Sequence, residues 1–144
     1  MSDPVATRRF PRAGIDPVAT PTAAHHLVDA VRARPPRHET VCILLDQRRS
    51  GVGIVSVDGT VEPDSVLDVV DLVVMTAVAD DRVDACVVAS IRPDGSDDLD
   101  DLERWSEMSI RLEEAGVELV EWFVLGTGVS CPRALLGEPS RWPG

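Results

Sequence analysis

The sequence predicts an α/β domain in which a mixed β-sheet is flanked by helices. Short apolar runs, such as residues 40–46, lack polar alternation and are typical of strands buried on both faces. Longer segments, such as residues 99–115, place apolar side chains every three or four positions, as on one face of a helix. Because the two kinds of segment alternate, with Gly, Pro and Asp between them, a sheet packed against helices is expected.

The N-terminal segment differs in composition from the rest of the chain. Residues 1–21 combine four prolines with three arginines and show no apolar periodicity, so they are expected to form a disordered or loosely attached arm. Residues 22–144 are expected to form a single domain. Its first helix is predicted over residues 22–33, with Thr22 as its cap, because apolar residues lie at helical spacing and Pro35-Pro36 follows.

Two further helices and four strands are predicted in the remainder. A helix over residues 64–79 begins near proline and acidic residues, which are favoured at helix N-termini, and one over residues 99–115 ends at Gly116. The predicted strands cover residues 40–46, 52–57, 84–90 and 117–125, and the first two form a hairpin. After residue 126 the chain is expected to be mostly irregular, with a short edge element at 131–136.

Composition limits the class of protein. The content of 44% hydrophobic and 27% charged residues is ordinary for a globular domain, and no apolar run reaches the roughly 18 residues of a membrane-spanning helix. The N-terminal residues lack the apolar core of a secretory signal, so a cytoplasmic protein is expected. The three cysteines are expected to be reduced, and the absence of Lys, Asn and Tyr is typical of a G+C-rich bacterial genome.

The net charge of −11 is unevenly distributed along the chain. Residues 58–121 hold nineteen acidic residues against four arginines, whereas residues 1–57 hold eight arginines against five acidic residues. Nucleic-acid binding depends mainly on Lys and Arg at phosphates, so the acidic part argues against that function. The acidic surface is expected either to keep the domain soluble or to contact a protein partner.

Several short motifs occur in the order found in one known family. The series comprises Glu39-Thr40-Val41-Cys42-Ile43-Leu44-Leu45-Asp46, Asp58-Gly59-Thr60, Arg92-Pro93-Asp94-Gly95, Leu112-Glu113-Glu114-Ala115-Gly116 and Glu121-Trp122. Over about residues 39–137 it resembles the metallopeptidase-like domain of the RadC family, a bacterial branch of the JAB/JAMM (MPN) superfamily. The resemblance implies the mixed α/β sheet of that superfamily.

The resemblance also implies where a metal site would lie. Active members hold zinc with an H-x-H pair and an aspartate, and a glutamate acts as general base on the metal-bound water. The matching positions here are Ser90 and Arg92 for the H-x-H pair, Glu103 or Trp105 for the aspartate, and Glu39 for the base. Serine is a poor zinc ligand and arginine cannot give up its proton, so the site is degenerate and no metal or other cofactor is expected.

Two features leave other chemistry open. An acidic cluster that could bind a hard cation comprises Asp97, Asp98, Asp100 and Asp101. Acidic residues before a helix are also explained by the helix dipole, without any bound ion. Glu39 could act as a base beside such a cation, or it could form an ion pair with Arg92 in place of the metal.

The function expected from these features is that of a non-catalytic RadC-like domain, a pseudoenzyme that serves as a protein-interaction or scaffold module. One alternative is a metal-dependent hydrolase that uses Glu39 and a non-zinc cation, which requires Glu39 and the acidic cluster to share one pocket. Another is a DNA-associated regulator, suggested by the N-terminal arginines. Protein partners are expected without membrane attachment, and exposed sheet edges are compatible with a homodimer.

Overall fold

The computed structural model describes residues 5–8, 17–95 and 98–143, with side chains described from residue 17 onward. The strands are β1 (Val5–Arg8), β2 (Glu39–Leu45), β3 (Gly51–Asp58), β4 (Ala85–Ile91), β5 (Glu118–Leu125) and β6 (Val129–Ser130). The helices are α1 (Pro21–Val31), α2 (Ser65–Ala79), α3 (Asp101–Glu114) and α4 (Pro132–Leu135). None of these helices combines the length and the apolar character needed to cross a membrane.

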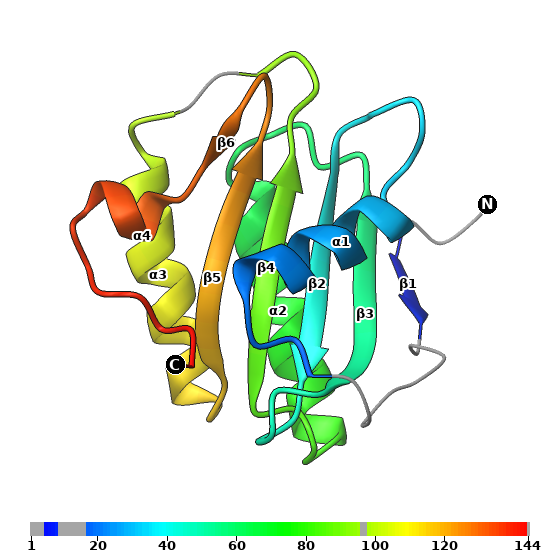
Figure 1. The fold of residues 1–144 in the computed structure, drawn as a ribbon, viewed down its shortest axis with the longest axis vertical. Helices are drawn as coiled ribbons and strands as arrows, with labels where there is room; N and C mark the ends of the chain where they lie inside the picture. The colour runs from blue at the N-terminus through cyan, green and yellow to red at the C-terminus, as the bar shows by residue number, and fades with distance from the viewer. Residues whose placement is uncertain (1–4, 9–16, 96–97, 144) are drawn as a thin grey trace.

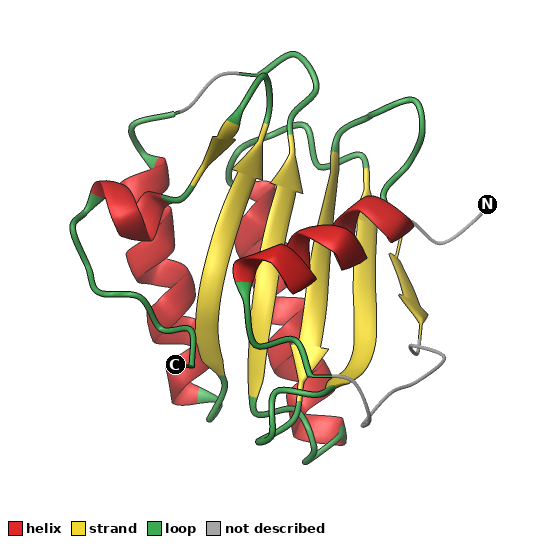
Figure 2. Ribbon diagram, viewed as in Figure 1, coloured by secondary structure: helices red, strands yellow, loops and turns green. Residues whose placement is uncertain are grey.

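The strands form one mixed sheet in the order β1-β3-β2-β4-β5-β6 (Figure 1, Figure 2). Only β4 and β5 run parallel, connected through α3, and the other neighbouring pairs are antiparallel. Helix α1 lies across one face of the sheet, and α2 and α3 cover the other face (Figure 1). The predicted α/β class, with a mixed sheet flanked by helices, is confirmed.

Two hydrophobic cores form because alternate residues of each buried strand point to opposite faces of the sheet. In β2, Cys42 and Leu44 point toward α2 and α3. Val41, Ile43 and Leu45 point toward α1. Every residue of β2 is buried as a result, which explains why the strand is apolar without alternation.

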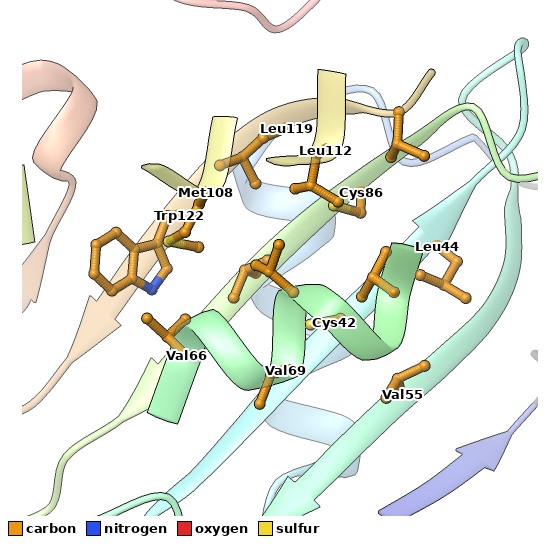
Figure 3. Close-up of a cluster of buried hydrophobic side chains, with 14 of the residues drawn as sticks. Cys42, Leu44, Val55, Val66, Val69, Cys86, Met108, Leu112, Leu119 and Trp122 are labelled. Atoms are coloured by element: carbon orange, nitrogen blue, oxygen red, sulfur yellow. The ribbon is translucent and has the colours of Figure 1, made fainter. Parts of the chain in front are cut away.

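The larger core lies between the sheet and the helices α2 and α3 (Figure 3). Helix α3 contributes Trp105, Met108 and Leu112, all fully buried. Burial of an apolar side chain of this kind stabilises the fold by roughly 1.5–3 kcal/mol. Cys86 lies in the same core, where burial raises the pKa of its thiol to about 12. A thiol this far from ionisation behaves as a small apolar side chain.

The segment expected to be an arm is partly integrated into the fold. Residues Val5–Arg8 form the edge strand β1, which pairs with β3. Val18 is buried in the core beneath α1. Four residues are too few to show periodicity, so no pattern in the sequence indicates that β1 pairs with β3. Residues 1–4 and 9–16 of this segment lie outside the described residues.

Two local predictions are wrong. Thr20, not Thr22, caps α1, because its hydroxyl accepts a hydrogen bond from the N–H of Ala23 at 3.2 Å. The short edge element expected at residues 131–136 is the helical turn α4, and the edge strand β6 lies just before it. Pro132 starts α4, and its fixed φ suits the first position of a helix better than a strand.

Candidate functional site

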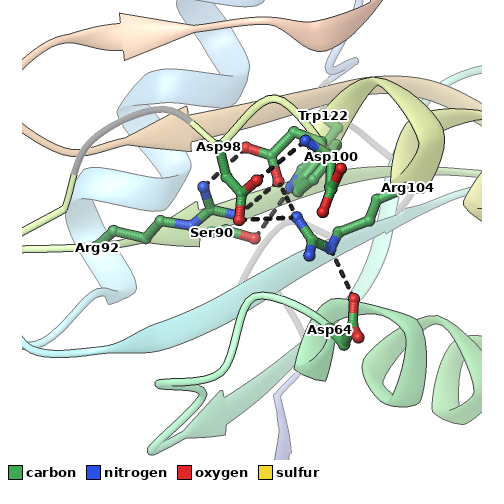
Figure 4. A network of polar contacts seen from close by, with 8 residues as sticks. Asp64, Ser90, Arg92, Asp98, Asp100, Arg104 and Trp122 are labelled. Carbon is green, nitrogen blue, oxygen red and sulfur yellow. Dashed lines mark hydrogen bonds and ion pairs between the residues drawn. The ribbon is translucent and has the colours of Figure 1, made fainter.

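An ion pair joins the end of β4 to the start of α3. Arg92 follows β4 directly, and its two terminal nitrogens donate to the two carboxylate oxygens of Asp101 at 2.8 and 2.9 Å (Figure 4). Both side chains are buried, with 10% and 5% of their surface exposed. A bidentate pair of this kind fixes the relative position of the two side chains as well as neutralising their charges.

Arg104 extends this network from α3 to α2. Its guanidinium donates to Asp101 at 3.0 Å and to Asp64, at the start of α2, at 2.8 Å, and it lies 3.3 Å from Asp98. The N–H of Asp100 donates to Asp98, and this hydrogen bond is the main reason that the pKa of the Asp98 carboxyl is lowered. The carboxylates of Asp98 and Asp101 therefore bind groups of the protein itself.

Ser90 lies beside Arg92 on the face of β4 that points toward α3. The Ser90 hydroxyl accepts a hydrogen bond from Trp122 Nε1 at 3.0 Å, and the Arg92 guanidinium lies 6.0 Å from the centre of the Trp122 ring. These residues do not fit a zinc ion. The Ser90 oxygen already accepts a hydrogen bond from the Trp122 indole. The Arg92 guanidinium carries a fixed positive charge and has no lone pair to donate to a metal.

The two residues expected at the position of the metal aspartate lie elsewhere. Glu103 is exposed on the surface of α3. Trp105 is fully buried in the larger core, and its Nε1 donates to Glu138 at 2.8 Å. The acidic residue that meets Arg92 is Asp101, two positions before Glu103. Spacing could not identify it, because the loop after β4 differs in length from the family pattern.

Glu39 points to the opposite face of the sheet. It pairs with Ile91 across β2 and β4, so its side chain points toward α1 and away from that of Arg92. Its carboxylate accepts hydrogen bonds from the N–H of Ala33, just after α1, and from the hydroxyl of Ser56 at 3.5 Å. The ion pair between Glu39 and Arg92 suggested by the sequence is not formed, and Glu39 instead links the end of α1 to the sheet.

The acidic cluster does not converge with Glu39. Asp98 and Asp100 line an open groove, Asp101 is buried against arginine, and Asp97 lies outside the described residues. Glu39 does not line that groove. Among the residues that the structure describes, no group of three His, Cys, Asp or Glu side chains is arranged to hold a metal ion. The shared pocket that the hydrolase alternative requires is therefore not formed by these residues.

The groove beside the ion pair has a volume of about 600 Å³. The exposed side chains of Val61 and Leu99 contribute apolar surface to it. His38 and Asp94 also line it, with Nε2 of the histidine 2.8 Å from a carboxylate oxygen of the aspartate. Nothing in the sequence indicates this contact, because the two residues are far apart along the chain and come together only when β2 and β4 pair.

The loop after β4 packs closely against the loop after β5. A Cβ atom at Gly126 would lie 2.5 Å from the carbonyl oxygen of Gly95. A Cβ atom at Gly95 would lie 2.6 Å from the Cβ of Arg92. Neither position has room for a side chain, so the two glycines allow the approach that fixes the loop next to the ion pair.

Gly126→Ala is expected to lower the free energy of unfolding by about 1–3 kcal/mol, because the added methyl group meets rigid main chain. Gly128→Ala is the matched control, since a Cβ atom there has nothing within 4 Å. Urea denaturation of both variants measures the difference. Equal destabilisation by the two substitutions would show that the loops are not packed as described.

Comparison with known proteins does not assign the chain to a family. No protein-family model matches the chain, and no curated protein matches it. What the site itself presents is a buried network of arginines and carboxylates beside an open groove that is both apolar and acidic.

Proposed function

We propose that the protein is a non-catalytic RadC-like domain of the JAB/MPN type, which has lost its zinc site and acts as a protein-interaction or scaffold module. The observation that supports this most is the bidentate pair between Arg92 and Asp101. If the chain is aligned with RadC-like domains, Ser90 and Arg92 occupy the positions of the two histidine ligands of the metal. A guanidinium at that point occupies the carboxylate oxygens that a metal would need and cannot activate water as a metal does.

The rest of the network favours a structural role for these residues. Arg104 shares Asp101 with Arg92 and also binds Asp64, so the end of β4 and the starts of α2 and α3 are held together. Breaking a buried ion pair by removing one partner costs several kcal/mol. A network of this kind keeps the surface around it in one conformation, which suits a binding scaffold.

The proposed contact with a protein partner is the groove beside the ion pair. Val61 and Leu99 expose apolar surface there, and Asp94 and Asp98 supply carboxylates. Protein interfaces combine an apolar centre with a polar rim in this way. The proposed location is the bacterial cytoplasm, which agrees with the three free cysteines, because disulfides are rare there.

The two alternative functions have less support. A hydrolase that pairs Glu39 with the acidic cluster needs both on one face of the sheet, whereas Glu39 points toward α1. A DNA-associated regulator would need a basic surface, whereas residues 58–121 hold nineteen acidic residues against four arginines.

Elemental analysis of the purified protein, combined with thermal melting, tests the loss of the metal site. We expect no stoichiometric metal, and the same Tm with and without a chelator. A metal bound at one hundred times its Kd would add about 2.7 kcal/mol to the free energy of unfolding, so its removal would be readily visible. One zinc per chain, or a lower Tm with chelator, would contradict the proposal and make Glu39 the first residue to substitute in a peptidase assay.

A further inference from the structure

The groove beside the Arg92–Asp101 pair is lined by apolar side chains from two loops. Leu99, in the loop before α3, is 87% exposed, more than any other large apolar side chain of the described residues. Val61, which is also exposed, and Pro63 come from the loop between β3 and α2. Exposed apolar side chains that line a concave site are typical of a place where another molecule binds.

The arginines beside the groove do not balance its negative charge. Arg92 lines the groove, but the bidentate contact with Asp101 already neutralises its guanidinium. Arg104 is shared by three carboxylates, those of Asp64, Asp98 and Asp101. The two guanidinium groups are therefore used within the network, and neither is left to neutralise the remaining carboxylates of the groove.

Asp94 and Asp100 are the carboxylates of the groove that contact no arginine of the described residues. The Asp94 side chain is 79% exposed, and its contact is with His38, which carries a charge only when it is protonated. Asp100 is exposed, forms no capping hydrogen bond to α3, and has no described side chain paired with its carboxylate (Figure 4). Exposed carboxylates of this kind attract a cationic group of another molecule.

Lysine and arginine side chains match both the apolar and the acidic part of the groove. Each has an aliphatic stem and a charged end, so the stem can lie on apolar surface while the end stays with charged groups. The volume of the groove, about 600 Å³, falls within the roughly 300–1,000 Å³ of sites that take small ligands. It therefore has room for a few side chains of a partner, and not for a folded domain.

We propose that the groove binds a short segment of a protein partner in which a lysine or arginine stands next to an apolar residue. This inference rests on the proposed function, because it takes the groove as the contact with the partner. Other occupants fit less well. The carboxylates repel the phosphates of a nucleic acid or of an anionic lipid surface. The net charge of −11 disfavours a second copy of this chain.

Peptide selection tests the chemistry of the partner segment without knowledge of its sequence. Random-sequence peptides displayed on phage are selected on the full chain and, in parallel, on the variant Leu99→Ser/Asp100→Asn. Both positions are exposed, so the variant is expected to fold as the unmodified chain does. We expect peptides that carry Lys or Arg beside an apolar residue to be enriched on the unmodified chain and not on the variant.

The affinity of the most enriched peptide is then measured by fluorescence anisotropy. The matched control is Val78→Ser/Glu114→Gln, which changes the same kinds of group at exposed positions of α2 and α3 outside the groove. We expect the Kd for Leu99→Ser/Asp100→Asn to rise about tenfold or more, and the Kd for the control to stay unchanged. Added salt is expected to raise the Kd, because salt screens charges at an exposed site.

Three results would overturn the inference. The first is enrichment of neutral or acidic peptides that need Leu99 and Asp100, which removes the cationic chemistry but keeps the groove as the contact. The second is cationic peptides that bind the unmodified chain and the groove variant equally, which places their site elsewhere. The third is no enrichment that depends on Leu99 and Asp100, which removes both this inference and the proposed contact.

The loss of the zinc site is judged separately from the peptide selection. A stoichiometric metal in the purified protein would contradict that part of the proposed function, whatever peptides are enriched. If circular dichroism shows that Leu99→Ser/Asp100→Asn is unfolded, Asp100→Asn alone takes its place and decides by the same criteria.

Discussion

Asp101→Ala is expected to lower the free energy of unfolding by about 3–5 kcal/mol, the range found when one partner of a buried ion pair is removed. The carboxylate of Asp101 is shared by Arg92 and Arg104, and the Arg92 side chain is only 10% exposed. Loss of the Asp101 carboxylate leaves the Arg92 charge buried without the acceptor that neutralises it. Urea denaturation monitored by circular dichroism gives the difference directly.

Asp64→Ala is the matched control for this substitution. Asp64 also binds Arg104, but the Asp64 side chain is 77% exposed. The free energy of unfolding is therefore expected to fall by less than about 1 kcal/mol. Replacement of both buried partners, Arg92→Met with Asp101→Leu, is expected to be close to neutral or stabilising, because desolvation of the two charges is avoided. Similar losses for Asp101→Ala and Asp64→Ala would mean that the Arg92 pair is not desolvated.

Ser90→His combined with Arg92→His is expected to create a zinc site with Asp101. Ser90 in β4 and Arg92 directly after it both point to the side of the sheet that α3 covers, and the Asp101 carboxylate is within 2.9 Å of the Arg92 guanidinium that the change removes. Two histidines and a carboxylate are a common ligand set for zinc. Zinc at one hundred times its Kd should then raise the free energy of unfolding by about 2.7 kcal/mol, measured as a rise in Tm.

The control for the zinc site adds Asp101→Asn to the two histidines. The neutral amide is a much weaker ligand than a carboxylate, so the rise in Tm with zinc should be lost. The unmodified chain should show no zinc-dependent change at all. A folded histidine variant that gains nothing from zinc would remove the main support for a common origin with the RadC-like metal site.

Much of the fold could be predicted from residue patterns, because the signals are local. The apolar run of β2 and the helical spacing of Trp105, Met108 and Leu112 identify their elements within a single window of sequence. The edge elements could not be predicted in the same way. β1 and β6 are short, and they are strands only because a longer strand lies beside them.

The candidate site could be predicted only in part, because its geometry depends on strand register. The sequence singled out Glu39 and Arg92, but only the pairing of Glu39 with Ile91 determines that the two side chains point to opposite faces. The partner of Arg92 was missed for a different reason. Asp101 meets it because α3 starts there, and no local pattern fixes where the loop after β4 ends.

The Arg92–Asp101 pair also fixes the two ends of the loop that lies between its residues. Near the start of this loop, Gly95 has no room for a side chain. Each doubling in the length of a flexible loop costs only about 0.6 kcal/mol when its ends are fixed. Insertions after Gly95 are therefore expected to change the free energy of unfolding only slightly. Leu99 and Asp100 stand on this loop and line the groove, so a change in the length of the loop would alter the groove while the two ends of the loop stay in place.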